Sequence, residues 1–194
     1  NGLEAAPLYH PPPDVAGFYK GRTEDYIYYP SRLEFLKRQN LLIEAARHLR
    51  SPVKIIIGGD GSNREEYQRL IDEYALHARV RLLGHTSVAE KQAWYAHALA
   101  VFYGPYDEDY GYVTLEAMLS SKPVITCEDS GGPLEFVQHG ETGLVQSAEP
   151  EQIAANIDWL YFNRTRAIEM GRAARAYFGE LDMSWEHVVS RLLG

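Results

Sequence analysis

Short apolar runs, each followed by a polar turn and then by a helical pattern, constrain the fold of this chain more than any other feature. The runs are rich in β-branched and aromatic residues, and Gly or Pro directly follows each of the first four. Strand and helix patterns alternate five or six times, which is typical of right-handed parallel units. The alternation predicts an α/β fold, a doubly wound and mostly parallel sheet flanked by helices, with a helical C-terminal segment. The expected strands lie at 26–29, 53–57, 80–83, 98–103, 123–126 and, as a short sixth strand, 143–145.

Glycines and charged residues follow the expected strands directly. In an open parallel sheet these positions lie at one edge, outside the carboxyl ends of the strands, where such sheets bind ligands. We therefore expect one crevice lined by segments that are far apart in the sequence. These segments are Arg32, Gly58–Gly61, Gly84-His85, Asp107–Gly111 and Ser130–Gly132.

The stretch from Asp107 to Met118 contains two glutamates in a strand–loop–helix arrangement. Glu108 lies in an acidic loop, Gly111 follows it, and Glu116 lies early on a helix that Leu115 and Met118 place against the core. A helix N-terminus offers free N–H groups to an anion, and a carboxylate one and a half turns further on could accept from a sugar diol. The alternative is an ordinary solvated loop with a glutamate that the helix dipole favours.

Three basic residues precede or begin the first expected helix, where positive charge opposes the dipole. Arg32, Lys37 and Arg38 would form a cationic corner in a protein whose formal net charge is −8. A bound diphosphate would remove the conflict, because arginine grips phosphate as a fork and lysine as a point charge. The alternative is that these side chains are exposed and bind nothing.

Several classes of function are disfavoured. The net charge of −8 argues against nucleic-acid binding, and no apolar run is long enough to insert into a membrane. A single cysteine, Cys127, excludes an internal disulfide and indicates a cytoplasmic protein. Neither a G-x-G-x-x-G nor a Walker A sequence is present, and Gly58–Gly61 is interpreted as a turn. Asp107-Glu-Asp109 matches a common metal-binding tripeptide but lacks further carboxylates, so we expect no metal.

Taken together, the motifs resemble the C-terminal domain of the family-4 retaining glycosyltransferases, which have the two-domain GT-B architecture. The likeness runs in order from about residue 26 to the end of the chain. The sequence departs from the family pattern at Ser31 and Arg38, where glycine is usual, and at Asp109-Tyr-Gly111, where Gly-Phe-Gly is usual. The matching pieces are Ser31-Arg-Leu33, Lys37 with Leu41–Ala45, Gly59-Asp-Gly61, Leu83-Gly84, Glu108–Met118, Lys122-Pro-Val124, Ser130–Glu135 and Gly140–Val145.

The resemblance implies the donor-binding half of an enzyme that transfers the sugar of a nucleoside diphosphate sugar. Arg32 and Lys37 would contact the diphosphate and assist catalysis, Glu108 would face the transferred sugar, and Glu116 would hold the ribose hydroxyls. The remaining donor-binding candidates follow the third strand or begin the helix after Glu108. They are Gly84, His85, Gly111, Tyr112 and Val113. Taken alone, a single histidine after a strand such as His85 favours a turn or surface role over that of a ligand or base.

The domain prediction divides the chain at residue 26. Residues 1–25, with Pro11–Pro13, are expected to be an interdomain linker or N-terminal extension, and residues 26–194 a single nucleotide-sugar-binding domain. The expected partners are a UDP- or GDP-sugar and an acceptor-binding N-terminal domain of the same protein. That domain could also attach the protein peripherally to a membrane. Two alternatives remain open: a non-catalytic nucleotide-binding module or split-enzyme subunit, and a nucleotide-sugar epimerase of the same architecture.

Overall fold

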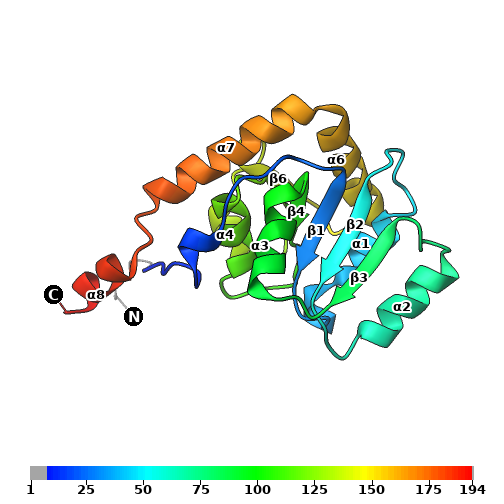
Figure 1. Cartoon of the computed structure of the whole chain (residues 1–194), viewed down its shortest axis with the longest axis horizontal. Coiled ribbons are helices and arrows are strands. Elements are labelled where there is room, and N and C mark those ends of the chain that lie inside the picture. The colour runs from blue at the N-terminus through cyan, green and yellow to red at the C-terminus, as the bar shows by residue number, and fades with distance from the viewer. Residues whose placement is uncertain (1–7, 194) are drawn as a thin grey trace.

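The computed structural model describes residues 8–193 and contains one six-stranded sheet flanked by helices (Figure 1). All neighbouring strands pair in parallel, in the order β3-β2-β1-β4-β5-β6. The strands are β1 (Tyr26–Pro30), β2 (Lys54–Gly58), β3 (Val80–Gly84), β4 (Ala100–Phe102), β5 (Val124–Cys127) and β6 (Gly143–Gln146). The doubly wound α/β prediction is confirmed, and each strand expected from the sequence is present.

The order of the strands reverses between β1 and β4. Counting outwards, β2 and β3 lie on one side of β1, while β4, β5 and β6 lie on the other. In doubly wound sheets this switch point opens a crevice between the loops that follow the two central strands. The loops after β1 and β4 are therefore the places where the topology puts a ligand.

Helices cover both faces of the sheet. Helix α1 contacts both α2 and α6, and α4 contacts α7. The helices are α1 (Gln39–Ala45), α2 (Arg64–Glu73), α3 (Val88–His97), α4 (Tyr112–Leu119), α5 (Pro133–Phe136), α6 (Pro150–Phe162), α7 (Arg164–Glu180) and α8 (Trp185–Leu193). Short 3₁₀ turns occur at Val15–Gly17 (η1) and Phe35–Lys37 (η2). No helix in residues 8–193 is long and apolar enough to cross a membrane.

Local sequence signals place two of the helix starts. Ser87 caps α3, since its hydroxyl accepts from the Glu90 amide at 3.3 Å while the Glu90 carboxylate accepts from the Ser87 amide at 2.9 Å. Pro150 is the first residue of α6, where a missing N–H costs nothing. The sequence Ser62-Asn-Arg-Glu65 predicts a similar capping box at the start of α2. This prediction is wrong, because Asn63 precedes the helix and its side chain makes no cap.

The segment before β1 is attached to α3. Phe18 is buried against the Tyr95 ring, and the amides of Gly21 and Glu24 donate to carbonyls at the end of α3, at 2.9 and 2.8 Å. Residues 1–7 of the expected linker lie outside the described part of the chain. Residues 18–24 pack on the domain that they precede.

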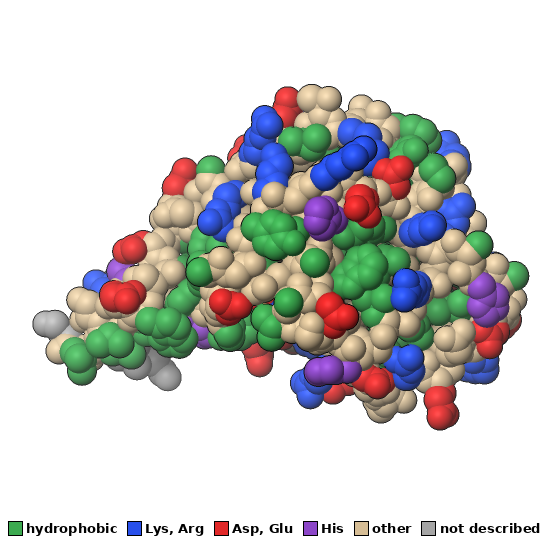
Figure 2. All heavy atoms as spheres, in the orientation of Figure 1, with side chains coloured by type: hydrophobic (Ala, Val, Ile, Leu, Met, Phe, Trp, Pro, Cys, Tyr) green, Lys and Arg blue, Asp and Glu red, His purple; other side chains and the backbone are tan. Residues whose placement is uncertain are grey.

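The last helix, α8, lies at the end of the molecule beside the described start of the chain (Figure 1). The His10 ring stacks on the Trp185 ring with their centroids 5.6 Å apart. Figure 2 shows hydrophobic side chains along this end of the molecule. The exposed apolar side chains of α8 are Trp185, Val189, Leu192 and Leu193.

Lys122 is a buried lysine at the amino edge of the sheet, two residues before β5. Its side chain contacts Thr23 Oγ1 at 3.5 Å, and the residue is only 2% exposed. Burial lowers the pKa of its ammonium group from 10.5 to about 8. At neutral pH the folded protein therefore holds a charge that its surroundings disfavour.

Replacing Lys122 by methionine should raise the free energy of unfolding at pH 7, by up to roughly 3 kcal/mol. As the pH rises above 8, the folded lysine releases its proton while the unfolded lysine keeps it. The parent gains stability in this window, so its difference from the variant should shrink toward about pH 10. Denaturant unfolding at both pH values measures the difference; a less stable variant at pH 7, or a constant difference, would contradict the expectation.

Candidate functional site

The loops after the strands meet at the carboxyl edge of the sheet, as the sequence predicts. The Leu33 amide donates to the Asp60 carbonyl at 3.0 Å, which joins the loops after β1 and β2. The Glu108 amide donates to the Ser130 carbonyl at 3.1 Å, which joins the loops after β4 and β5. The Tyr106 amide, after β4, donates to the Leu36 carbonyl, after β1, at 2.8 Å, so backbone contacts also join the two halves of the sheet edge.

Gly59 allows two of these loops to approach closely. Its φ is 118°, and a Cβ there would lie 2.1 Å from the Ser31 carbonyl oxygen. Its amide donates to the Gly84 carbonyl at 2.8 Å. Gly58–Gly61 is therefore a turn that packs on the backbone before Arg32, in agreement with its interpretation from sequence. Gly84 is buried at the end of β3, and His85 follows it in an exposed position.

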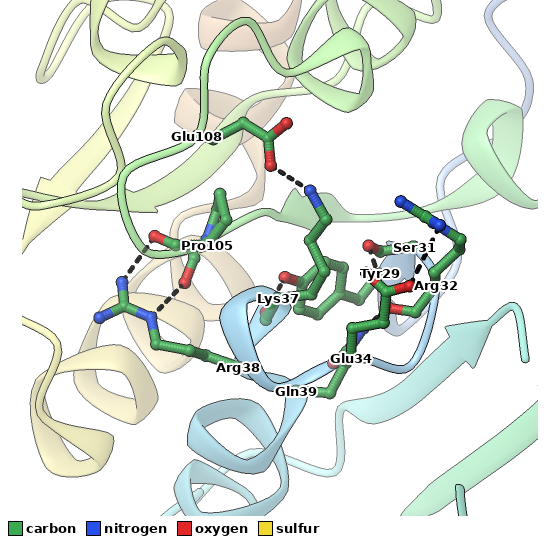
Figure 3. Close-up of polar contacts among 10 residues, drawn as sticks. Tyr29, Ser31, Arg32, Glu34, Lys37, Arg38, Gln39, Pro105 and Glu108 are labelled. Atoms are coloured by element: carbon green, nitrogen blue, oxygen red, sulfur yellow. Dashed lines mark hydrogen bonds and ion pairs between the residues drawn. The ribbon is translucent and has the colours of Figure 1, made fainter. Parts of the chain in front are cut away.

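Lys37 and Glu108 meet across the topological switch point. Lys37 is the last residue of η2, after β1, and its ammonium forms an ion pair with the Glu108 carboxylate from the loop after β4. Figure 3 shows the two side chains pointing toward each other. Their side chains are 18% and 21% exposed, so the pair is partly screened from water. Two of the three candidate catalytic residues thus lie where the topology places a ligand.

Arg32 lies beside this pair without joining it (Figure 3). Its side chain is 76% exposed and forms an ion pair with Glu34 at 3.1 Å. An exposed pair of this kind is weak, and the guanidinium can turn toward a ligand at little cost. Arg32 therefore lies near the site without a fixed place in it.

The structure corrects the expected cationic corner in one respect. Arg38 does not face the crevice; its guanidinium pairs with Asp129 and contacts the carbonyl oxygens of Gly104 and Pro105. The first helix also begins at Gln39 rather than at Arg38. Of the three basic residues, Arg32 and Lys37 remain at the edge of the site, each in an ion pair with a glutamate.

A glycine turn precedes α4. Gly111 has φ 81° and ψ 62°, the left-handed conformation that glycine adopts without strain. Tyr112 and Val113 follow as the first helical residues, whose amides have no acceptor within the helix. The turn leaves these amides available to an anion at the positive end of α4.

Glu116 is buried on α4 and already has two partners. Its carboxylate accepts from Lys91 Nζ at 2.6 Å and from Tyr95 Oη at 2.8 Å, both on α3. Burial, reinforced by the Glu116 charge, raises the pKa of the Tyr95 hydroxyl well above its ordinary value, so Tyr95 remains a donor. A carboxylate has about four acceptor positions, which leaves room for two more hydroxyls.

Tyr103 lies beneath the Lys37–Glu108 pair. The Lys37 ammonium is 6.0 Å from the centre of its ring. Burial, together with the Glu108 carboxylate, raises the pKa of the Tyr103 hydroxyl. The floor of the site is therefore aromatic and remains neutral.

The described residues show no arrangement suited to a metal. Asp107 and Asp109 are exposed in the loop after β4. Among residues 8–193, no three His, Cys, Asp or Glu side chains gather closely enough to hold an ion.

Sequence reasoning missed Lys91 and Tyr95 as partners of Glu116. The capping box at Ser87 fixes where α3 begins, and the spacing of Lys91 and Tyr95 puts both on one face of it. The spacing of Lys91 and Tyr95 could therefore have been read from the sequence. That their shared face turns toward α4 depends on tertiary packing, which the sequence does not give directly.

A parallel sheet in the order 3-2-1-4-5-6, with a polar site at its switch point, defines a Rossmann-like domain of the kind that binds nucleotides. The sequence model of the glycosyl transferases group 1 family matches residues 17–177, so the chain belongs to this family. Its fold is that of the C-terminal domain of a GT-B glycosyltransferase.

Two curated relatives and one solved structure illustrate the relationship. The chain is 31% identical over 158 residues to a poly(ribitol-phosphate) alpha-N-acetylglucosaminyltransferase of Staphylococcus aureus, a match that covers 79% of this chain and 32% of that protein. It is 32% identical over 175 residues to a GDP-mannose-dependent alpha-(1-6)-phosphatidylinositol monomannoside mannosyltransferase of Mycobacterium tuberculosis, covering 84% and 44%. A crystal structure of an S. aureus TarM mutant with fondaparinux, alpha-GlcNAc-glycerol and UDP matches with a TM-score of 0.82 and 27% identity, covering 97% of this chain and 37% of that one.

The chain spans less than half of the length of these relatives.

Proposed function

We propose that this chain is the donor-binding half of a retaining glycosyltransferase that uses a UDP- or GDP-sugar. The observation that carries the proposal is the meeting of Lys37 and Glu108 at the switch point, beside the free amides of α4. This surface combines a cation for a diphosphate with a carboxylate for a sugar. The names of the relatives, which are glycosyltransferases, favour this function over an epimerase or a non-catalytic nucleotide-binding module.

In the proposed complex, Lys37, Arg32 and the amides of Tyr112 and Val113 contact the diphosphate. The diphosphate is the leaving group, and its negative charge grows as the bond to the sugar breaks. Cations and helix amides stabilise this charge more in the transition state than in the bound donor, which lowers the barrier. Lys37 and Arg32 thus bind the donor and also stabilise the departing diphosphate.

Glu108 and Glu116 have different proposed roles. Glu108 is partly exposed in the crevice and faces the transferred sugar, while its ion pair with Lys37 orients its carboxylate. Glu116 is buried, and Lys91 and Tyr95 hold its carboxylate in place for the ribose hydroxyls. Gly84 and His85, at the end of β3, complete the proposed nucleotide wall.

We propose that donor binding needs no metal. The positive groups Lys37 and Arg32 and the end of α4 can neutralise a diphosphate without a divalent ion. Asp107 and Asp109 are exposed, and within residues 8–193 no third His, Cys, Asp or Glu joins them, which supports this proposal.

The acceptor, in this proposal, is held by an N-terminal domain of the same protein. The greater length of the relatives supports it. The exposed apolar face of α8 offers such a domain a surface to pack on. We further propose a cytoplasmic location, in which the single buried thiol of Cys127 stays reduced.

Calorimetric titration of the chain with UDP and with GDP tests the proposed function. One of the two should bind, binding should persist with a chelator present, and the 2′-deoxy analogue should bind more weakly. The analogue lacks one hydroxyl donor for Glu116. Glu116→Gln should therefore narrow the difference in affinity between the nucleotide and its 2′-deoxy analogue. Absence of binding by both nucleotides would refute the proposal, a strict metal requirement would make Asp107 and Asp109 ligands, and equal affinity for the deoxy analogue would remove the ribose role of Glu116.

A further inference from the structure

Arg38 occupies a backbone position that disfavours its side chain. Its φ of 51° and ψ of 42° lie in the left-handed region, immediately before α1. A residue with a Cβ is strained there, whereas glycine is not. The family pattern that this sequence resembles has glycine at this position. A guanidinium at such a position should therefore make contacts that offset the strain.

The Arg38 side chain makes an unusually complete set of contacts. Its two Nη atoms donate to the two carboxylate oxygens of Asp129, each at 2.7 Å. Its Nε donates to the Gly104 carbonyl at 2.9 Å, and Nη2 also donates to the Pro105 carbonyl at 2.7 Å. The side chain is only 16% exposed, and a forked, charge-assisted pair of this kind is both strong and directional.

Both members of the Arg38–Asp129 pair stay charged around neutral pH. The hydrogen bond from Arg38 holds the pKa of the Asp129 carboxyl below its ordinary value, so the pair stays ionised under ordinary conditions.

These contacts connect the three loops that form the centre of the site. Arg38 follows β1, Gly104 and Pro105 follow β4, and Asp129 follows β5. The Asp129 carbonyl accepts from the Asp107 amide at 3.0 Å, directly beside Glu108. Figure 3 shows Arg38 extending to the Pro105 loop on one side while Lys37 reaches Glu108 on the other. Consecutive residues thus hold the same loop at two places.

We propose that Arg38 is a positioning residue, which fixes the distance between Lys37 and Glu108 by tying the loops after β1, β4 and β5 together. This inference rests on the proposed donor site. A loop held in place before the donor arrives does not have to be ordered on binding. Less of the free energy of the interaction between Lys37 and the diphosphate is then offset by ordering, and the affinity is higher.

The test compares Arg38→Gly with the parent in calorimetric titration with UDP or GDP, whichever the parent binds. Glycine removes the guanidinium and also the backbone strain, so the variant retains a favourable backbone. We expect affinity to fall about 3- to 30-fold. The matched control is Arg164→Ala, which removes the arginine of an ion pair with Asp25 at the opposite edge of the sheet and should leave affinity unchanged.

A double-variant cycle separates positioning from general loss of structure. If Arg38 acts through Lys37, then Arg38→Gly should have less than about a twofold effect when Lys37 is already alanine. A general structural role would lower affinity equally whether residue 37 is lysine or alanine. Added guanidinium ion should also restore part of the affinity of Arg38→Gly, because it can occupy the vacated place between Asp129 and the two carbonyls.

The outcomes distinguish this inference from the proposed function. No nucleotide binding by the parent would refute the proposed function. Binding by the parent with equal affinity of Arg38→Gly, or with the same loss in both backgrounds, would refute the role of Arg38 alone. If thermal unfolding shows that Arg38→Gly is not folded, Asp129→Asn takes its place. Its loss of nucleotide affinity should be smaller and should again depend on the presence of Lys37.

Discussion

Replacing Lys37 by alanine should weaken binding of a nucleoside diphosphate by about 10- to 150-fold. A hydrogen bond to a charged group contributes roughly 1.5–3 kcal/mol, and each 1.4 kcal/mol is a factor of ten in affinity. Lys37 is partly buried at the switch point, where its charge is less screened than that of Arg32. Calorimetric titration of the parent and the variant under the same conditions gives the ratio.

Part of this loss should come from Glu108 rather than from the missing ammonium. Removing Lys37 leaves the Glu108 carboxylate unpaired beside the place proposed for the diphosphate, and like charges repel. The double variant Lys37→Ala with Glu108→Gln should therefore bind more tightly than Lys37→Ala alone. Lys54→Ala, at the start of β2 and the opposite edge of the sheet, is the control and should match the parent. An affinity of Lys37→Ala equal to that of the parent would remove Lys37 from the donor site.

The fold was predictable because its signals are local. The apolar runs that form β1, β2 and β5 are short and end at turn residues, so their positions follow from the sequence within one or two residues. The order of the strands does not follow in the same way, since several orders are compatible with alternating strands and helices. It depends on which helix packs on which face, as when α1 packs on α6 far along the chain.

The candidate site was predictable in its location but not in its contacts. That Lys37 and Glu108 lie at one edge follows from each residue coming after a strand. That they pair with each other follows only from the strand order, which makes β1 and β4 neighbours. Arg38 illustrates the limit: its basic side chain predicts anion binding, whereas its left-handed backbone turns the side chain toward Asp129 instead.

The error at α2 has a similarly local cause. Ser62 and Glu65 have the spacing of a capping box, but Asn63 competes for the same role one residue later. Its side chain donates to Glu66 at 2.9 Å, and the helix begins at Arg64. Two candidate caps side by side leave the first turn undetermined until the rest of the fold is present.

The chain by itself should bind the donor and form no glycosidic product. The loops after β1, β3, β4 and β5 make one wall of a crevice, and Glu108 and Lys37 on that wall contact the donor in the proposed complex. Transfer also requires an acceptor held in position for attack, which can account for roughly 7–11 kcal/mol of the barrier.

A single wall also leaves the reacting carbon in contact with water. The electrostatic effect of Lys37 and of the α4 amides on the leaving group is weakened by this solvent, because the effective dielectric constant is higher than in a closed site. Incubating the chain with labelled UDP- and GDP-sugars and a broad mixture of acceptors should therefore give no labelled glycoside, under conditions where calorimetry shows that the nucleotide is bound. The bound nucleotide is the necessary control, since it separates a folded but incomplete site from an unfolded chain. Glycoside formation by the purified chain would mean that its own residues also hold the acceptor, and the proposed division between a donor half and an acceptor half would then be wrong.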